Sequence, residues 1–233
     1  MADLFKQYGI KEVADVTIYK LETKNGVTTE TPFLFLDTLK VSTLEQTAEQ
    51  SDARGGKGNP KLITWDYGKE INVTLEDALY SPASMALMWG GENGQWTETT
   101  SIITKGFRVD ATATVGSKIK DGKGNEWTIQ SLITGGSGMA VCTASVASKI
   151  LTIGADDFPG TYKIVGDTYA RNRDTGEDEY FQFIIERAKM SAEQTLTLEA
   201  EGDPTTFNLN LTVLRPTTGN MIKLVQYDFA SGE

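Results

Sequence analysis

Residues 55–58 place three glycines around one lysine, a composition that could bind a phosphate group. A phosphate-binding loop requires a glycine, four residues, a second glycine, a lysine and a hydroxyl residue, followed by a helix whose first N–H groups face the anion. Here Lys57 precedes Gly58 and Asn59, and a proline and a β-type pattern come next. We therefore interpret the segment as a loop and not as a nucleotide site.

Two acidic segments carry partial signatures of other chemistry. Residues 174–176 match the Asp-Thr-Gly triplet of aspartic proteases, but charged residues flank them where the protease motif follows a buried apolar strand. Residues 121–126 (DGKGNE) concentrate oxygen ligands as calcium loops do, yet they lack the alternating ligands and distal glutamate of an EF-hand. We expect a hairpin turn at the first segment and a β-turn at the second.

The chain contains no histidine, which removes the commonest general base, the commonest zinc ligand and the Ser–His and Cys–His pairs of nucleophilic catalysis. Cys142 is the single cysteine, and its small apolar neighbours predict a core residue that forms no intrachain disulfide. We predict that the protein is not an enzyme and that it holds no metal and no cofactor.

The net charge of −10 and the pI near 4.7 argue against a nucleic-acid-binding protein, because affinity for phosphates rests on lysine and arginine. The hydrophobic content of 39% is ordinary for a globular protein. No run approaches the roughly 18 to 20 apolar residues of a membrane span, and the N-terminus lacks the pattern of a signal peptide. We expect assembly in a reducing cytoplasm and no membrane partner.

Alternation of apolar and polar residues with a period of two dominates the chain. It is clearest over 206–213, and it recurs over 195–201 and 71–76. Weaker strands are predicted at 15–21, 32–40, 61–66, 107–115, 126–133, 139–145, 149–153, 161–168, 180–188 and 221–227. Such strands, separated by glycine and asparagine turns, predict a mainly β protein with an antiparallel sandwich or barrel.

One short helix is signalled by its ends. Ser81 can cap it, Pro82 suits the first helical position, and Gly90 with Gly91 can end it in the left-handed conformation. A second helix is expected near 2–9. Residues 43–52 are compatible with either a helix or an extended arm.

Composition also predicts an insertion. Polar, glycine-containing stretches bound residues 97–155, which have strands and small-residue turns of their own. We predict a main β domain from 1–96 and 156–233, with 97–155 as an inserted small β subdomain.

Two segments, 52–91 and 156–228, carry a resemblance to a known family. The first reads as loop, strand, turn, strand and capped helix, and the second as a succession of strands that closes the chain. In this order they resemble the tail tube proteins of tailed bacteriophages, whose fold is shared with the tubes of contractile injection machines. The resemblance covers roughly half of the chain and leaves 97–155 outside it.

The resemblance implies a structural virion protein of the tail, in which hexameric rings of this chain stack into a tube that conducts DNA during ejection without binding it specifically. Tape measure, baseplate and sheath proteins are the further partners that it implies. Two alternatives stay open. One is a baseplate or tail-terminating protein with the same fold, and the other is a carbohydrate-binding β-sandwich with exposed Trp96 and Trp127.

The resemblance also places a long inter-ring loop at 43–60. Its polar residues and glycines predict an arm without stable structure in the monomer, ordered only against a neighbouring ring, where Arg54 meets an acidic patch. The candidate loop residues are Leu44, Glu45, Glu49, Asp52, Arg54, Gly55, Gly56, Lys57 and Gly58. The candidate lumen-facing acids, on polar strand faces, are Glu70, Glu76, Glu199 and Glu201.

Overall fold

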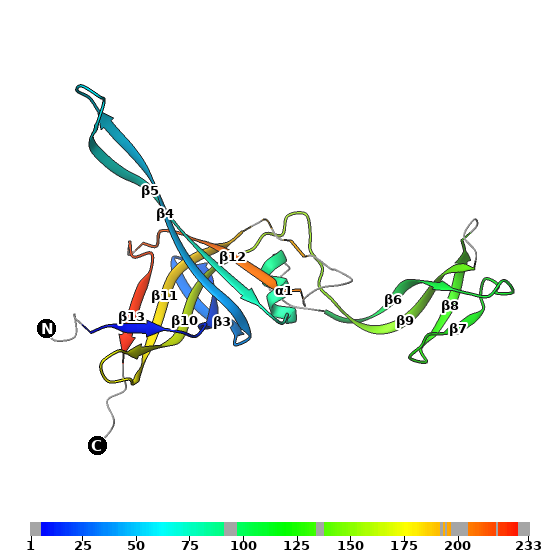
Figure 1. The fold of residues 1–233 in the computed structure, drawn as a ribbon. Helices are drawn as coiled ribbons and strands as arrows, with labels where there is room; N and C mark the ends of the chain where they lie inside the picture. Colours follow the sequence, from blue (N-terminus) through cyan, green and yellow to red (C-terminus); the bar gives the residue numbers. More distant parts are fainter. Residues whose placement is uncertain are drawn as a thin grey trace, which may run out of the picture. The chain divides into compact units, whose positions relative to one another are not determined.

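The computed structural model describes residues 6–90, 97–133, 138–191, 193, 195–196, 205–217 and 219–227. The chain divides into two compact units, one formed by Met1–Gln95 with Ile153–Glu233 and the other by Trp96–Thr152. Each unit contains one antiparallel sheet (Figure 1). The predicted mainly β, antiparallel class with one short helix is confirmed for the part of the chain that the structure describes.

The first unit is built on a nine-stranded sheet with the order β3-β2-β10-β11-β12-β5-β4. The order contains seven of the nine strands, and the other two are β1, which pairs with β10, and β13, which pairs with β11. The elements are β1 (Tyr8–Ile10), β2 (Asp15–Lys24), β3 (Val27–Leu36), β4 (Leu39–Arg54), β5 (Lys61–Asp77), α1 (Pro82–Trp89), β10 (Thr161–Asn172), β11 (Asp178–Met190), β12 (Phe207–Val213) and β13 (Lys223–Tyr227).

Alternation along the strands produces a single core in this unit. Leu209, Leu211 and Val213 of β12 are buried while the residues between them are exposed, as the period of two predicts. They belong to the same buried cluster as Val16 and Ile18 of β2, although β10 and β11 lie between β2 and β12 in the sheet. The sheet therefore curls around one apolar interior. Burial of this cluster is the main favourable term that holds the unit together.

Helix α1 begins and ends where the sequence predicts. The Ser84 backbone N–H donates to Ser81 Oγ at 3.0 Å, and the Ser81 N–H donates to Ser84 Oγ at 2.8 Å, so the two serines cap the helix reciprocally. Gly90 has φ of 72° and ends the helix in the left-handed conformation. Leu87 and Met88 pack into the core of the first unit.

The other helix expectation is wrong, and the open alternative at 43–52 is decided in favour of the extended arm. Residues 8–10 form the short strand β1 against β10, so the predicted helix at 2–9 is not present in its described part. Residues 43–52 belong to β4, because the backbone pairs with β5 along the whole stretch and this pairing compensates for the lack of an apolar face. The predicted strand at 195–201 lies mostly outside the described residues.

The second unit contains a four-stranded sheet with the order β6-β9-β8-β7. Its strands are β6 (Thr97–Arg108), β7 (Lys118–Lys120), β8 (Glu126–Leu132) and β9 (Met139–Ile150). The core consists of Trp127, Ile129, Ala140 and Cys142, with Phe107 packed against it. Cys142 is therefore the core residue that the sequence predicts, and burial raises the pKa of its thiol.

Candidate functional site

Strands β4 and β5 form the longest hairpin of the protein and extend beyond the rest of the sheet (Figure 1). Strand β12 pairs with β5 from Asp77 only as far as Asn72. Beyond this point, among the residues that the structure describes, β4 and β5 pair only with each other up to Arg54 and Lys61. We call this projecting segment, residues 47–70, the arm.

The arm corrects the predicted loop at 43–60. Leu44, Glu45, Glu49, Asp52 and Arg54 lie in β4, and only residues 55–60 form the connecting turn. The prediction of a segment without stable structure is wrong because β5 supplies a hydrogen-bonding partner to every part of β4. Backbone pairing of this kind does not require an apolar pattern in both strands.

The turn at the end of the arm explains the glycines. The Asn59 N–H donates to the Gly56 carbonyl at 3.1 Å, and the Gly55 N–H donates to the Pro60 carbonyl at 3.3 Å. Gly56 and Gly58 have φ of 85° and 86°, in the region that favours glycine. A strand follows the turn instead of a helix, so the segment has no phosphate-binding geometry.

A bulge at Gly68 sets the two faces of the arm. Glu49 pairs with Tyr67 and Thr47 pairs with Glu70, so β5 contains one more residue than β4 between these pairs. Gly68 has φ of 62°, as the glycine of such a bulge requires. Directly paired residues share a face of a sheet, and therefore Tyr67 lies on the same face as Glu70.

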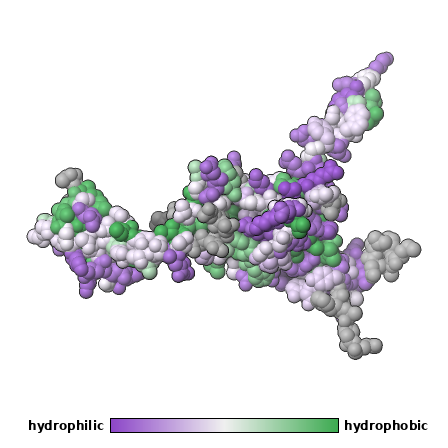
Figure 2. Space-filling view, turned by 180° about the vertical axis from the view of Figure 1, so that it is seen from behind, coloured by the Kyte–Doolittle hydropathy of each residue, from purple (hydrophilic) through white to green (hydrophobic). Residues whose placement is uncertain are grey.

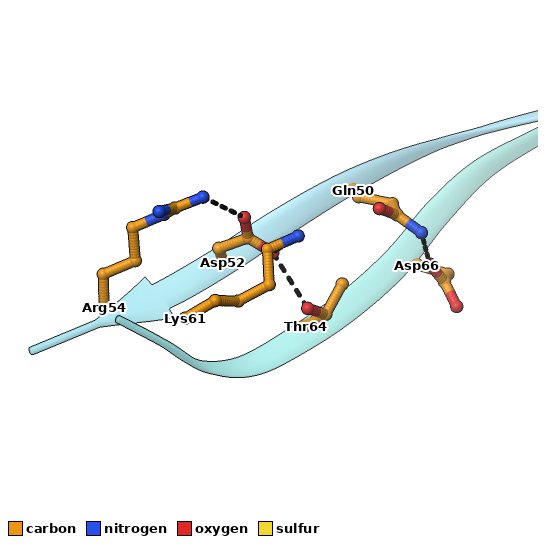
Figure 3. Close-up of polar contacts among 6 residues, drawn as sticks. All are labelled: Gln50, Asp52, Arg54, Lys61, Thr64 and Asp66. Carbon is orange, nitrogen blue, oxygen red and sulfur yellow. Dashed lines mark hydrogen bonds and ion pairs between the residues drawn. The ribbon is translucent and has the colours of Figure 1, made fainter. Parts of the chain in front are cut away.

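One face of the arm is a saturated polar network. Asp52 accepts from Thr64 Oγ1 at 2.9 Å, and its carboxylate pairs with Lys61 Nζ at 2.9 Å and with an Arg54 guanidinium nitrogen at 3.3 Å. The Lys61 hydrogen bond is the largest of the effects that lower the pKa of Asp52. Further toward the sheet, Gln50 Nε2 donates to Asp66 Oδ1 at 2.9 Å. Figure 3 shows these side chains crossing from one strand to the other.

The opposite face of the arm is apolar and aromatic. Ile63, Trp65 and Tyr67 follow one another on β5 with exposed fractions of 54%, 54% and 52%. Their partners on β4 include Ala53 and Ser51, whose side chains are too small to cover them. Figure 2 shows hydrophobic and hydrophilic surface on the projecting arm. The sequence analysis did not identify this face.

The acidic candidates fall into two groups. Glu70 and Glu76 lie on β5 and share the solvent-facing side of the sheet, where Glu76 pairs with Asn208 and Glu70 with Thr47. Only polar side chains separate them on this side of β5. Glu199 and Glu201 lie outside the described residues. Whether any of the four faces a lumen stays a prediction.

The other candidate chemistries have structural explanations. Asp121 accepts hydrogen bonds from Asn125 Nδ2 and Trp127 Nε1 and from the backbone N–H groups of Lys123 and Asn125, which lowers its pKa and leaves the carboxylate fully engaged. The triplet at 174–176 lies in the turn between β10 and β11, with Gly176 at φ of 74°. Both expected turns are therefore confirmed.

Nothing in the described ranges gathers a metal-binding cluster of histidine, cysteine or acidic side chains. Trp127 is only 6% exposed and packs in a core, so it cannot form the surface platform of the carbohydrate-binding alternative. Trp96, the second residue of that platform, lies outside the described residues. Within the residues that can be described, no helix has the length and apolar character to cross a bilayer.

Comparison with known proteins gives one family. The model of the YomU/Tube protein family matches residues 8–226, a span that includes the second unit, most of the first unit and the arm. A search of curated proteins finds no match. The family match covers the inserted region as well as the two segments on which the sequence resemblance rests.

Proposed function

Because the chain belongs to the YomU/Tube protein family, we propose that it is a structural protein of a phage tail, in which rings of identical subunits stack into a tube. Head-to-tail contacts between identical subunits close into rings, and rings stacked in register continue as a filament. The proposed ring is a hexamer, and DNA passes through the tube during ejection. The proposed site of action is the virion tail, after assembly in the host cytoplasm.

The observation that carries this proposal is the arm. It projects beyond the nine-stranded sheet and exposes three large apolar side chains of β5. Monomeric proteins rarely expose contiguous apolar surface without a partner for it. An arm of this kind suits a contact with the next ring, which is the role that the resemblance implies for this segment.

Charge supports passive conduction of DNA. The net charge of −10 disfavours counterion-release binding to phosphates. The solvent-facing side of β5 carries Glu70 and Glu76 among polar neighbours, and a lumen lined in this way would repel DNA. Tape measure, baseplate and sheath proteins are proposed further partners. A non-enzymatic role fits the absence of histidine from the sequence.

Electron microscopy of the purified protein tests the proposal. We expect rings and tubes whose growth rises with concentration. Rings that never stack would instead favour the baseplate or tail-terminating role, and a monodisperse monomer at all concentrations would contradict both. In a parallel gel-shift experiment at low salt we expect no complex with DNA, and tight salt-sensitive binding would contradict the passive conduit.

A further inference from the structure

We propose that the arm binds a second copy of this chain through the face formed by Ile63, Trp65 and Tyr67, while its polar face serves to hold the hairpin straight. This inference rests on the proposed function and names the contact that would join one ring to the next. It replaces Arg54, the residue on which the sequence analysis placed the contact, with an apolar determinant on the opposite face.

The register of the hairpin places the three side chains together. Ala53 pairs with Ile63, Ser51 with Trp65, and Glu49 with Tyr67. The three residues of β5 therefore project from one side of the ladder at successive steps of the pleat.

Their exposure indicates an absent partner. Each side chain leaves more than half of its surface in solvent, although the large residues of the same parity nearer the sheet, Ile71 and Val73, are 4% and 1% exposed. The bulge at Gly68 accounts for this difference in exposure, because it places the side chains of residues 63, 65 and 67 on the face opposite to that of Ile71 and Val73. Tryptophan and tyrosine are also the residues most enriched at the energetic centres of protein interfaces.

The polar face offers much less to a partner. Asp52 already has Thr64, Lys61 and Arg54 as partners, and Asp66 has Gln50. A new ionic contact would have to break or share these bonds, and exposed ion pairs contribute little to affinity. An isolated two-stranded hairpin is marginally stable in water, so this cross-strand network is best explained as reinforcement of the arm.

Charge complementarity favours a second copy as the occupant. Residues 52–66 carry Arg54, Lys57 and Lys61 against Asp52 and Asp66, a net charge of +1, within a chain whose net charge is −10. The weakly basic end of the arm is therefore attracted to the acidic remainder of another copy, which steers the encounter before the apolar face is buried. The same charge would be repelled by a basic partner.

The test compares three forms of the full chain in an assembly assay by light scattering and electron microscopy. The variant Trp65→Ser/Tyr67→Ser removes the apolar face. Its matched control, Val27→Ser, removes an apolar side chain that is 67% exposed at the start of β3, outside the arm. Thermal melts check that all three forms fold.

We expect the double variant to raise the critical concentration for tube growth by about tenfold or more, as loss of an interface hot spot does. We expect Val27→Ser to stay within about twofold of the wild type, as surface substitutions outside the contact do. A photo-crosslinking residue at position 65 should give dimers of this chain in assembled samples, whereas one at position 64 should not.

The outcomes separate the two proposals. Normal tubes from Trp65→Ser/Tyr67→Ser, or crosslinking from position 64 instead of 65, would overturn the assignment of the face while leaving the tube function intact. Crosslinks from position 65 to a different protein would overturn the assignment of the occupant. A wild-type protein that never assembles would overturn the proposed function and this inference together.

Discussion

Gly166 of β10 lies directly across the ladder from Phe183 of β11, and a Cβ atom added to Gly166 would lie 2.1 Å from Phe183 Cζ. The ring of Phe183 thus fills the space that any other residue at position 166 would need. Both residues lie on the core side of the sheet, where Phe183 is 4% exposed. This contact fixes the identity of residue 166 by packing and not by backbone conformation.

We predict that Gly166→Ala destabilises the first unit by about 1–3 kcal/mol, the usual cost of overpacking a core. A thermal or chemical melt measures this. Gly9→Ala is the control, because no atom lies within 4 Å of an added Cβ at Gly9 and a melt close to wild type is expected. Addition of Phe183→Leu to Gly166→Ala should recover part of the loss, and no recovery would mean that the ring is not the obstacle.

A chain of ion pairs in the first unit predicts that the folded state loses stability at acid pH. Glu186 of β11 accepts from Lys223 and lies 3.8 Å from Lys163, and Lys163 contacts Glu30 at 2.8 Å. The hydrogen bond from Lys223 is the largest of the effects that lower the pKa of Glu186. A carboxyl group with a lowered pKa in the folded state stabilises above its unfolded pKa of about 4.3 and loses this contribution as pH falls.

The melting temperature should therefore fall as pH drops below about 5, and Glu186→Gln should make this fall shallower. The hydrogen bond to Glu30 is the main cause that raises the pKa of Lys163, so its contribution is present below pH about 10 and is lost above that. Melts of wild type and Glu186→Gln across this range check both limits. An unchanged acid slope in Glu186→Gln would assign the acid loss to other carboxylates.

Asp121 organises a turn of the second unit. Its carboxylate joins the backbone of residues 123 and 125 to the side chain of Trp127, which is part of the core. We predict that Asp121→Ala unfolds the second unit at a lower temperature while the first unit melts as in wild type. Asp121→Asn keeps one acceptor oxygen and should lose less. Tryptophan fluorescence and calorimetry report the two transitions, and a concerted shift of both would contradict independent units.

The division of the chain predicts that the second unit can be removed. Replacement of residues 97–152 by a short Gly/Ser bridge leaves the nine-stranded sheet and its core residues intact. Insertions at such boundaries are generally dispensable for the fold of the host domain. We expect cooperative unfolding near the wild-type temperature by circular dichroism. Loss of cooperativity would show that the first unit needs these strands.

The sequence predicts those elements whose own pattern is strong. The alternation over 206–213 and the caps of α1 appear in the structure as β12 and Pro82–Trp89. Strand β4 was missed beyond residue 40, because its distal half is polar and is stabilised mainly by pairing with β5. The signal that could have revealed it is the β pattern at 61–66 after a glycine turn, since such a strand implies a partner on the other side of the turn.

The faces of the candidate site could not be predicted from alternation alone. On a regular strand, Ile63, Trp65 and Tyr67 would share the face of Ile71 and point toward the core side. The extra residue at Gly68 reverses this relationship, and a bulge depends on the register with the partner strand. The position of Arg54 in an ion pair with Asp52 of its own strand likewise follows from the hairpin and not from residue type.

Insertion of one alanine after Ala48 of β4 provides the last prediction, because it supplies a partner for the extra residue of the bulge and restores regular alternation between Tyr67 and Ile71. The apolar face of the arm would then turn to the side that carries Asp52 and Asp66 in the wild type. The core pairing of β5 with β12 begins at Asn72 and is not altered. We therefore expect a monomer that melts within a few degrees of wild type but no longer forms tubes.

Gly68→Asn is the control, because asparagine tolerates positive φ and the nearest atom to an added Cβ is Glu49 Cγ at 3.8 Å, an ordinary contact. Tube growth by Gly68→Asn and its loss in the insertion variant, followed by light scattering and electron microscopy, would show that the direction of the face governs assembly. Equal growth of both variants would show that stacking is indifferent to which side of the arm carries Trp65.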